Sequence, residues 1–171
     1  CHVSTLTGSP IVVGIAGSDE SLVGLAWATH EAAHQRRPLR LVHAWEVPVP
    51  GYVPVPASVE LVRESAESVL AEALAKAQEW APDVDAEGLL MHGPAGRVLL
   101  DQAADALMLV VGSHGRGGFA RLMLGSSSSA VAAHADVPVV VTRGTTSREA
   151  WRAAPVVVGV DGSVVSESAI D

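Results

Sequence analysis

The chain has 171 residues, about one domain of ordinary size with too little left over for a second. Apolar residues make up 49% of it and aromatic residues only 4%, so a core must consist mostly of Ala, Val and Leu. Nineteen acidic against eleven basic residues give a net charge of −8, which argues against nucleic-acid binding, because a phosphate backbone requires a dense Lys/Arg face. No apolar run approaches the ~18 residues that span a membrane, and the single cysteine, Cys1, excludes an internal disulfide. We expect a soluble, acidic, cytoplasmic protein with no nucleic-acid or membrane partner.

Residues 11–15 form an apolar run rich in β-branched side chains, typical of a strand buried on both faces of a parallel sheet. Ser18 or Asp19 can cap a following helix, which should end before Pro38 because the residue before a proline avoids the helical region. Further along the chain we expect strands at 39–45, 83–92, 107–111 and 137–142, helices at 58–80, 95–104 and 127–135, an exposed proline-rich loop at 48–56 and a glycine-rich loop at 112–125. This alternation predicts right-handed βαβ crossovers and an α/β fold, a doubly wound parallel sheet with helices on both faces.

The beginning of the chain is repeated near its end. Residues 10–21 align without gaps on residues 155–166, with seven of twelve positions identical and two Ile/Val exchanges. We therefore predict a tandem repeat, with a first domain at 10–143, a linker at 144–154 and the truncated start of a second copy at 155–171. The alternative is an extra strand with accidental similarity.

The glycine-rich loop carries the features of an anion-binding site. It follows a buried strand and leads into a helix, and ligands of open α/β sheets bind at the carboxyl ends of the strands. Gly125 to Ser128 place backbone N–H groups and hydroxyls at the start of that helix, where partial positive charge favours phosphate. Arg116 and Arg121 add positive charge to an otherwise acidic protein.

Known catalytic and phosphate-binding motifs do not fit this loop. A Walker loop requires a lysine, and Lys76 is the only one in the chain. The dinucleotide fingerprint is missing after the first strand. Ser113 and His114 lack the Gly-x-Ser-x-Gly elbow of hydrolases. His114 is expected to shape the loop or to lie near the phosphates, and His43, within an apolar strand, to be a hydrogen-bonded core residue.

The spacing that is present, Gly112-x2-Gly115-x9-Gly125-Ser126, resembles the ATP-binding signature G-x2-G-x9-G-S/T of the universal stress protein family. The resemblance covers residues 10–143 almost continuously. It includes the opening Val-Val-Gly-Ile-x-Gly-Ser, the stretch Leu41-Val-His-Ala-Trp45, the stretch Val110-Val-Gly-Ser-His-Gly-Arg116 and the stretch Val137-Pro-Val-Val-Val-Thr-Arg143. It implies a five-stranded sheet of order 3-2-1-4-5, the adenine-nucleotide α-hydrolase-like fold, in a cytosolic stress-response protein that binds ATP and is usually dimeric.

Carried over position by position, the resemblance places the ribose and phosphates along the glycine-rich loop and the adenine against the backbone of Ala44. The residue that closes the first strand is normally an aspartate, but here it is Ala16, whereas the repeat has Asp161. A lost charge-assisted hydrogen bond, ~1.5–3 kcal/mol, is expected to weaken nucleotide binding. The expected nucleotide-binding residues are Ala16, Ala44, Gly112, His114, Gly115, Arg116, Gly125, Ser126, Ser127 and Ser128.

The leading hypothesis is a regulatory stress-response protein that binds ATP, with or without Mg. The alternative, favoured by Ala16, is a non-nucleotide-binding dimerisation or interaction module of the same fold. An adenylyl-transferring enzyme would need a further acceptor pocket. No catalytic or metal-binding residue is assigned, and at most slow ATP hydrolysis is expected, so whether the protein is an enzyme stays open.

The apolar strand 137–142 is expected at an edge of the sheet, where unpaired N–H and C=O groups favour pairing with another chain. Pro138 is tolerated at such an edge. We therefore predict a homodimer through strand 137–142.

Overall fold

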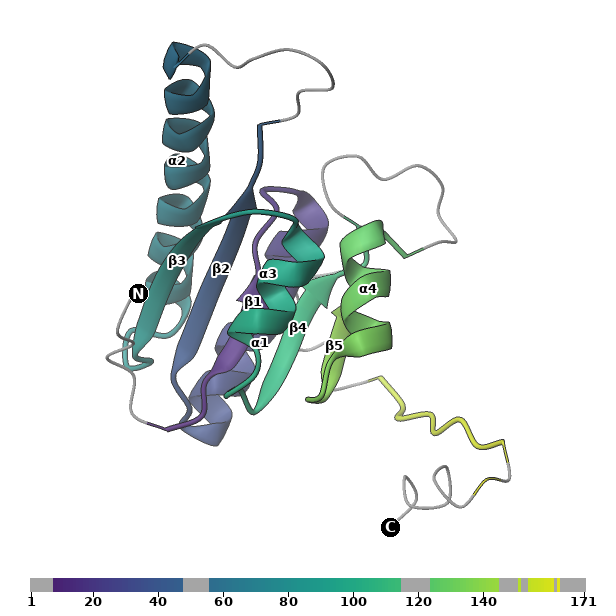
Figure 1. Cartoon of the computed structure of the whole chain (residues 1–171). Helices are drawn as coiled ribbons and strands as arrows, with labels where there is room; N and C mark the ends of the chain where they lie inside the picture. The colour runs from purple at the N-terminus through teal and green to yellow at the C-terminus, as the bar shows by residue number, and fades with distance from the viewer. Residues whose placement is uncertain are drawn as a thin grey trace.

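A five-stranded, all-parallel sheet in the order β3-β2-β1-β4-β5 organises the computed structural model (Figure 1). The structure describes residues 8–47, 56–114, 124–144, 151, 154–161 and 163. The predicted α/β class, the doubly wound sheet and the order 3-2-1-4-5 are confirmed. The elements are β1 (Ile11–Gly14), α1 (Asp19–Gln35), β2 (Leu39–Trp45), α2 (Pro56–Trp80), β3 (Ala86–His92), α3 (Ala95–Gln102), β4 (Met108–Gly112), α4 (Ser126–His134) and β5 (Val139–Thr142).

The sheet separates two apolar layers. Along the central strand β1, Ile11 and Val13 pack with α1 and α2, whereas Val12 packs with α3 and α4. All three side chains are fully buried, as expected for a parallel sheet covered on both faces. None of the described helices combines the length and the apolar character needed to cross a bilayer.

Several predicted boundaries differ from the observed ones by a few residues. The strand predicted at 83–92 begins at Ala86, because a turn in which the Val84 N–H donates to the Ala81 carbonyl precedes it. The strand predicted at 137–142 begins at Val139, after Pro138, which has no N–H to donate to a ladder. Residues 48–55 of the predicted proline-rich loop lie outside the described residues, and Pro56 is the first residue of α2, a position that suits proline.

The start of α1 is fixed by a cap and by a close approach to β4. Ser18 is the N-cap, and its hydroxyl accepts a hydrogen bond from the Ser21 N–H in a capping box. This first turn lies so close to the end of β4 that a Cβ on Gly112 would stand 2.6 Å from the Glu20 carbonyl oxygen. Glycine at 112 is therefore required by packing, whatever else it contacts.

A buried arginine, not anticipated from the sequence, joins three elements at the amino-terminal end of the sheet. Arg40, 5% exposed on β2, pairs through Nε with Glu87 on β3 at 2.8 Å. Its Nη1 pairs with Asp105 at 2.8 Å and donates to the Gln102 carbonyl at 3.0 Å. These partners provide hydrogen bonds to a guanidinium that is itself buried, which is the condition for tolerating a buried charge.

Gly112→Ala should destabilise the fold. The added Cβ meets backbone atoms of Glu20, which cannot rotate away, so either α1 or β4 must shift. We expect a loss of about 2 kcal/mol in the free energy of unfolding, measured by urea denaturation. The control is Gly159→Ala, where nothing lies within 4 Å of the added Cβ and no change is expected. Equal stabilities of the two variants would contradict this account of Gly112.

The Arg40 network should make stability pH-dependent. The hydrogen bond from Arg40 holds the pKa of the Asp105 carboxyl below its ordinary value, so the folded protein resists protonation there. The stabilisation is present above the ordinary carboxyl pKa, near 4, and is lost as pH falls through the lowered value. Because the Asp105 side chain is 64% exposed, Asp105→Asn should cost less than about 1 kcal/mol at neutral pH.

Urea unfolding of wild type and Asp105→Asn between pH 7 and pH 2 tests this dependence. The difference between the two proteins should close as the pH falls. Asp101→Asn, which removes an exposed pair with Arg97 on α3, serves as the control and should show a smaller difference at neutral pH. If the difference in unfolding free energy between wild type and Asp105→Asn stays constant with pH, protonation of the Asp105 carboxylate does not affect stability.

Candidate functional site

A pocket of about 780 Å³ opens at the carboxyl ends of β1, β2 and β4. Every predicted site residue that the structure describes lines this pocket; Gly115 and Arg116 lie outside the described residues. The described lining residues include Ala16, Ala44, Gly112, His114, Gly125, Ser126, Ser127 and Ser128. The strand order explains this convergence. β2 and β3 are added on one side of β1, and β4 and β5 are added on the other, so the connections that follow β1 and β4 leave the sheet in opposite directions and a crevice forms between them.

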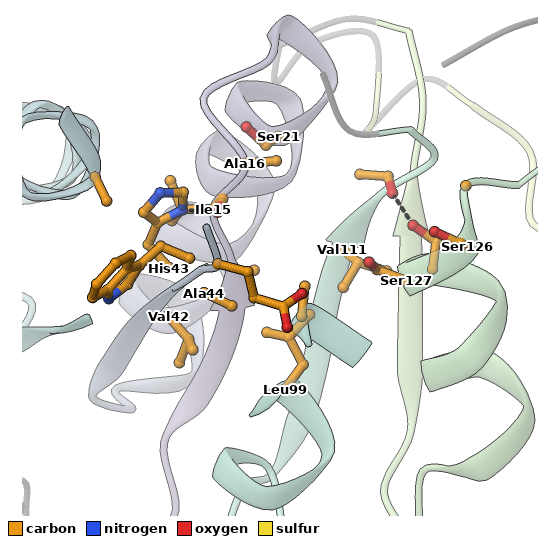
Figure 2. A pocket seen from close by; sticks show the side chains of 18 of the residues that line it. Ile15, Ala16, Ser21, Val42, His43, Ala44, Leu99, Val111, Ser126 and Ser127 are labelled. Atoms are coloured by element: carbon orange, nitrogen blue, oxygen red, sulfur yellow. Dashed lines mark hydrogen bonds between the residues drawn. The ribbon is translucent and has the colours of Figure 1, made fainter. Parts of the chain in front are cut away.

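The start of α4 forms one side of the pocket. Gly125 is the N-cap, and no side chain caps the helix, so the N–H groups of its first turn point beyond the helix end. The Ser128 hydroxyl is buried and donates to the Gly112 carbonyl at 2.7 Å, which joins α4 to β4. Ser126 and Ser127 are more exposed, and Figure 2 shows them across the pocket from His43 and Ala44. This side offers donors and partial positive charge to an anion.

The end of β2 forms the opposite side. His43 is buried, with Nδ1 2.6 Å from the carbonyl oxygen of Ile15 (Figure 2). Because a carbonyl only accepts, Nδ1 carries the proton and donates, and the ring fixes the end of β2 against the end of β1. The prediction that His43 is a hydrogen-bonded core residue is confirmed, although it also lines the pocket.

Apolar side chains from two helices complete the wall next to β2. Leu61 and Val62 come from α2, and Leu99 comes from α3. Leu61 is 67% exposed and therefore lies at the open rim of the pocket. Sequence analysis missed these residues because their spacing signals only a helix, and nothing local indicates which helix borders the site.

Two hydrogen bonds join the start of α1 to the β4–α4 connection, and a third lies within that connection. The Ser18 hydroxyl donates to the His114 carbonyl at 3.3 Å. The Ser113 hydroxyl donates to Glu20 Oε2 at 3.4 Å, and the Gly125 N–H donates to the Ser113 carbonyl at 2.8 Å. Ala16, on the β1–α1 connection, also lines the pocket, but its methyl group offers no hydrogen bond.

The described part of the pocket carries little charge. Glu46, an exposed side chain just after β2, is the only carboxylate among the described lining residues. In the described part of the chain, no three His, Cys, Asp or Glu side chains gather in a way that could hold a metal ion. The arrangement can bind a ligand with an anionic end at α4 and an apolar end at β2 and α2.

Comparison with known proteins agrees with this fold. The model of the universal stress protein family matches residues 9–143. Universal stress protein Rv2005c of Mycobacterium tuberculosis is 41% identical over 139 residues, which cover 79% of this chain and 45% of that protein. The chain thus spans about half the length of the curated relatives that it matches.

Solved structures share the fold. A universal stress protein in complex with cAMP superposes with a TM-score of 0.62 at 22% identity, covering 80% of this chain and 98% of that one. The universal stress protein from Archaeoglobus fulgidus in complex with dAMP gives a TM-score of 0.57 at 24% identity, covering 78% and 96%. With a family model matching most of its length and relatives above 40% identity, this chain belongs to the universal stress protein family.

Proposed function

We propose that the pocket binds an adenine nucleotide, with ATP as the ligand, and that the protein is a cytoplasmic regulatory protein of the stress response. One observation carries the proposal: the uncapped start of α4, with Gly125 and the exposed Ser126, faces an apolar wall across a single cavity. Phosphates suit the α4 side, and a planar base suits the apolar side. The complexes of family members with cAMP and dAMP support this assignment.

The volume and the low charge of the pocket support a nucleotide. About 780 Å³ falls within the usual range for small-molecule sites. With no cluster of three potential metal ligands among the described residues, any Mg²⁺ would be held chiefly by the phosphate oxygens and water.

The direct test is to denature the purified protein and identify released nucleotide by chromatography. Absence of released nucleotide, together with no heat of binding on titration with ATP, would favour an interaction module of the same fold.

Ala16→Asp should strengthen ATP binding about tenfold, because it would add a charge-assisted hydrogen bond on the pocket wall. The repeat indicates where that carboxylate belongs, since Asp161 aligns with Ala16. Affinities are measured by titration calorimetry. Ala16→Asn, which has the same shape without the charge, is the control and should give a smaller gain. Unchanged or weaker binding by Ala16→Asp would mean that residue 16 does not face the nucleoside.

We also propose a homodimer through strand 137–142, with residues 155–171 beginning a second copy of the domain after a linker at 144–154. β5 stands at one end of the described sheet, and Val139 to Val141 are only partly buried. Val156 and Val157, which align with Ile11 and Val12 of β1, are 93% and 86% exposed. Two-fold pairing of β5 would cover an apolar edge.

Val140→Lys should disrupt this dimer. A lysine within β5 puts a charge at the proposed contact and disfavours strand pairing. Sedimentation at tens of micromolar should show a dimer for wild type and a shift toward monomer for the variant. Val157→Lys, on the exposed segment outside the sheet, is the comparison for a charge added elsewhere. A monomeric wild type, or a sedimentation profile that Val140→Lys leaves unchanged, would reject the arrangement.

A further inference from the structure

One buried polar atom in the pocket has no hydrogen-bond partner among the described residues. Nε2 of His114 is out of contact with solvent and unpaired, while its residue lines the pocket. A buried polar atom without a partner is unfavourable, because the loss of its contact with water is not offset by a hydrogen bond. On a residue that lines a pocket, such an atom favours a ligand group that supplies the missing hydrogen bond.

The other ring nitrogen is held by a chain of two hydrogen bonds. Nδ1 of His114 lies 3.2 Å from the Ser113 hydroxyl, and that hydroxyl donates to Glu20 Oε2 at 3.4 Å. A hydroxyl has one proton and an ionised carboxylate only accepts, so the serine proton is directed to Glu20. Ser113 must then accept from Nδ1–H, which leaves Nε2 with a lone pair. Nε2 is therefore an unpaired hydrogen-bond acceptor on a residue that lines the pocket.

An acceptor at this point selects for a particular part of a ligand. An unprotonated phosphate also has only acceptors and cannot satisfy Nε2. His114 follows β4, and the strand order places β4 on the opposite side of β1 from β2 and its apolar wall. Along a nucleotide whose base lies at that wall and whose phosphates lie at α4, the group that comes between is the sugar, which carries hydroxyl donors.

We propose that Nε2 of His114 accepts a hydrogen bond from a sugar hydroxyl of the bound nucleotide, and that Ser113 and Glu20 are positioning residues that keep this nitrogen unprotonated. This inference rests on the proposed function. The Ser18 hydroxyl, which donates to the His114 carbonyl at 3.3 Å, fixes the backbone from which the ring projects. All three supporting side chains come from the start of α1 and the end of β4.

The first experiment measures the tautomer of His114 without any ligand. Long-range 1H–15N NMR near pH 8, where imidazoles are generally neutral, should show Nδ1 protonated in the wild type. In Ser113→Ala, Nε2 should become the protonated nitrogen. The backbone bonds of Ser113 to Thr142 and Gly125 do not involve its hydroxyl, so the variant should fold, as its melting curve checks.

His134 is the internal control for this spectrum. Its Nδ1 lies 2.9 Å from the Ala130 carbonyl, which can only accept, so its tautomer should stay the same in both proteins. A His114 that carries its proton on Nε2 in the wild type would overturn the proposal. So would a His114 tautomer that does not change in Ser113→Ala.

The second experiment compares ATP with its 2′-deoxy and 3′-deoxy forms by calorimetry. In the wild type, one deoxy form should bind about fivefold more weakly than ATP, the value of one net hydrogen bond. If the wild type binds all three alike, the hydroxyl contact is wrong and the proposed function stands. If it binds none of them, both the proposed function and this inference fail.

Discussion

The pocket depends on the close approach of two backbones, the first turn of α1 and the end of β4. The missing side chain of Gly112 allows the Glu20 carbonyl to lie where a Cβ would stand 2.6 Å from it. Gly24, one turn further along α1, extends the contact, since its added Cβ would meet Thr142 Oγ1 at 3.2 Å. Two hydrogen bonds between described residues, from Ser18 to His114 and from Ser113 to Glu20, span this junction. A wider separation would remove both hydrogen bonds.

The strand order then gives the pocket two chemically different sides. From β1 the chain continues to β2 on one side of β1, and it later returns to β4 on the other side. The connections that follow these strands therefore diverge at the carboxyl end of β1. On the β2 side, the nearby helices contribute apolar side chains such as Leu61 and Leu99. On the β4 side, the chain leads to the start of α4, where backbone N–H groups are available. The asymmetry therefore follows from topology together with the residues that begin or border each helix.

Sequence reasoning succeeded where the signal was local and failed where it depended on distant partners. The apolar run at 11–15 and the serines after Gly125 identify a strand and a helix start by themselves. The convergence of Ala16 and Ala44 on one pocket followed only from the family resemblance. Arg40 was missed because a charged residue within a strand normally indicates a solvent-facing position, and its partner Asp105 is far along the chain. The contribution of Leu61 on α2 to the pocket depends in the same way on tertiary packing.

The replacement of the repeat's Asp161 by Ala16 changes how the pocket can recognise a ligand. A carboxylate at the end of β1 would attract donors through charge, an interaction that acts at a distance and is screened by salt. Without it, the acceptor that we propose at His114 Nε2 is a single ring nitrogen, whose hydrogen bond needs close and well-aligned geometry. Glu46 does provide a negative charge, but on an exposed side chain beyond β2, where water weakens its interactions. Recognition in this domain would then depend more on the precise position of the His114 ring than on charge, and that position is set by the junction of α1 with β4.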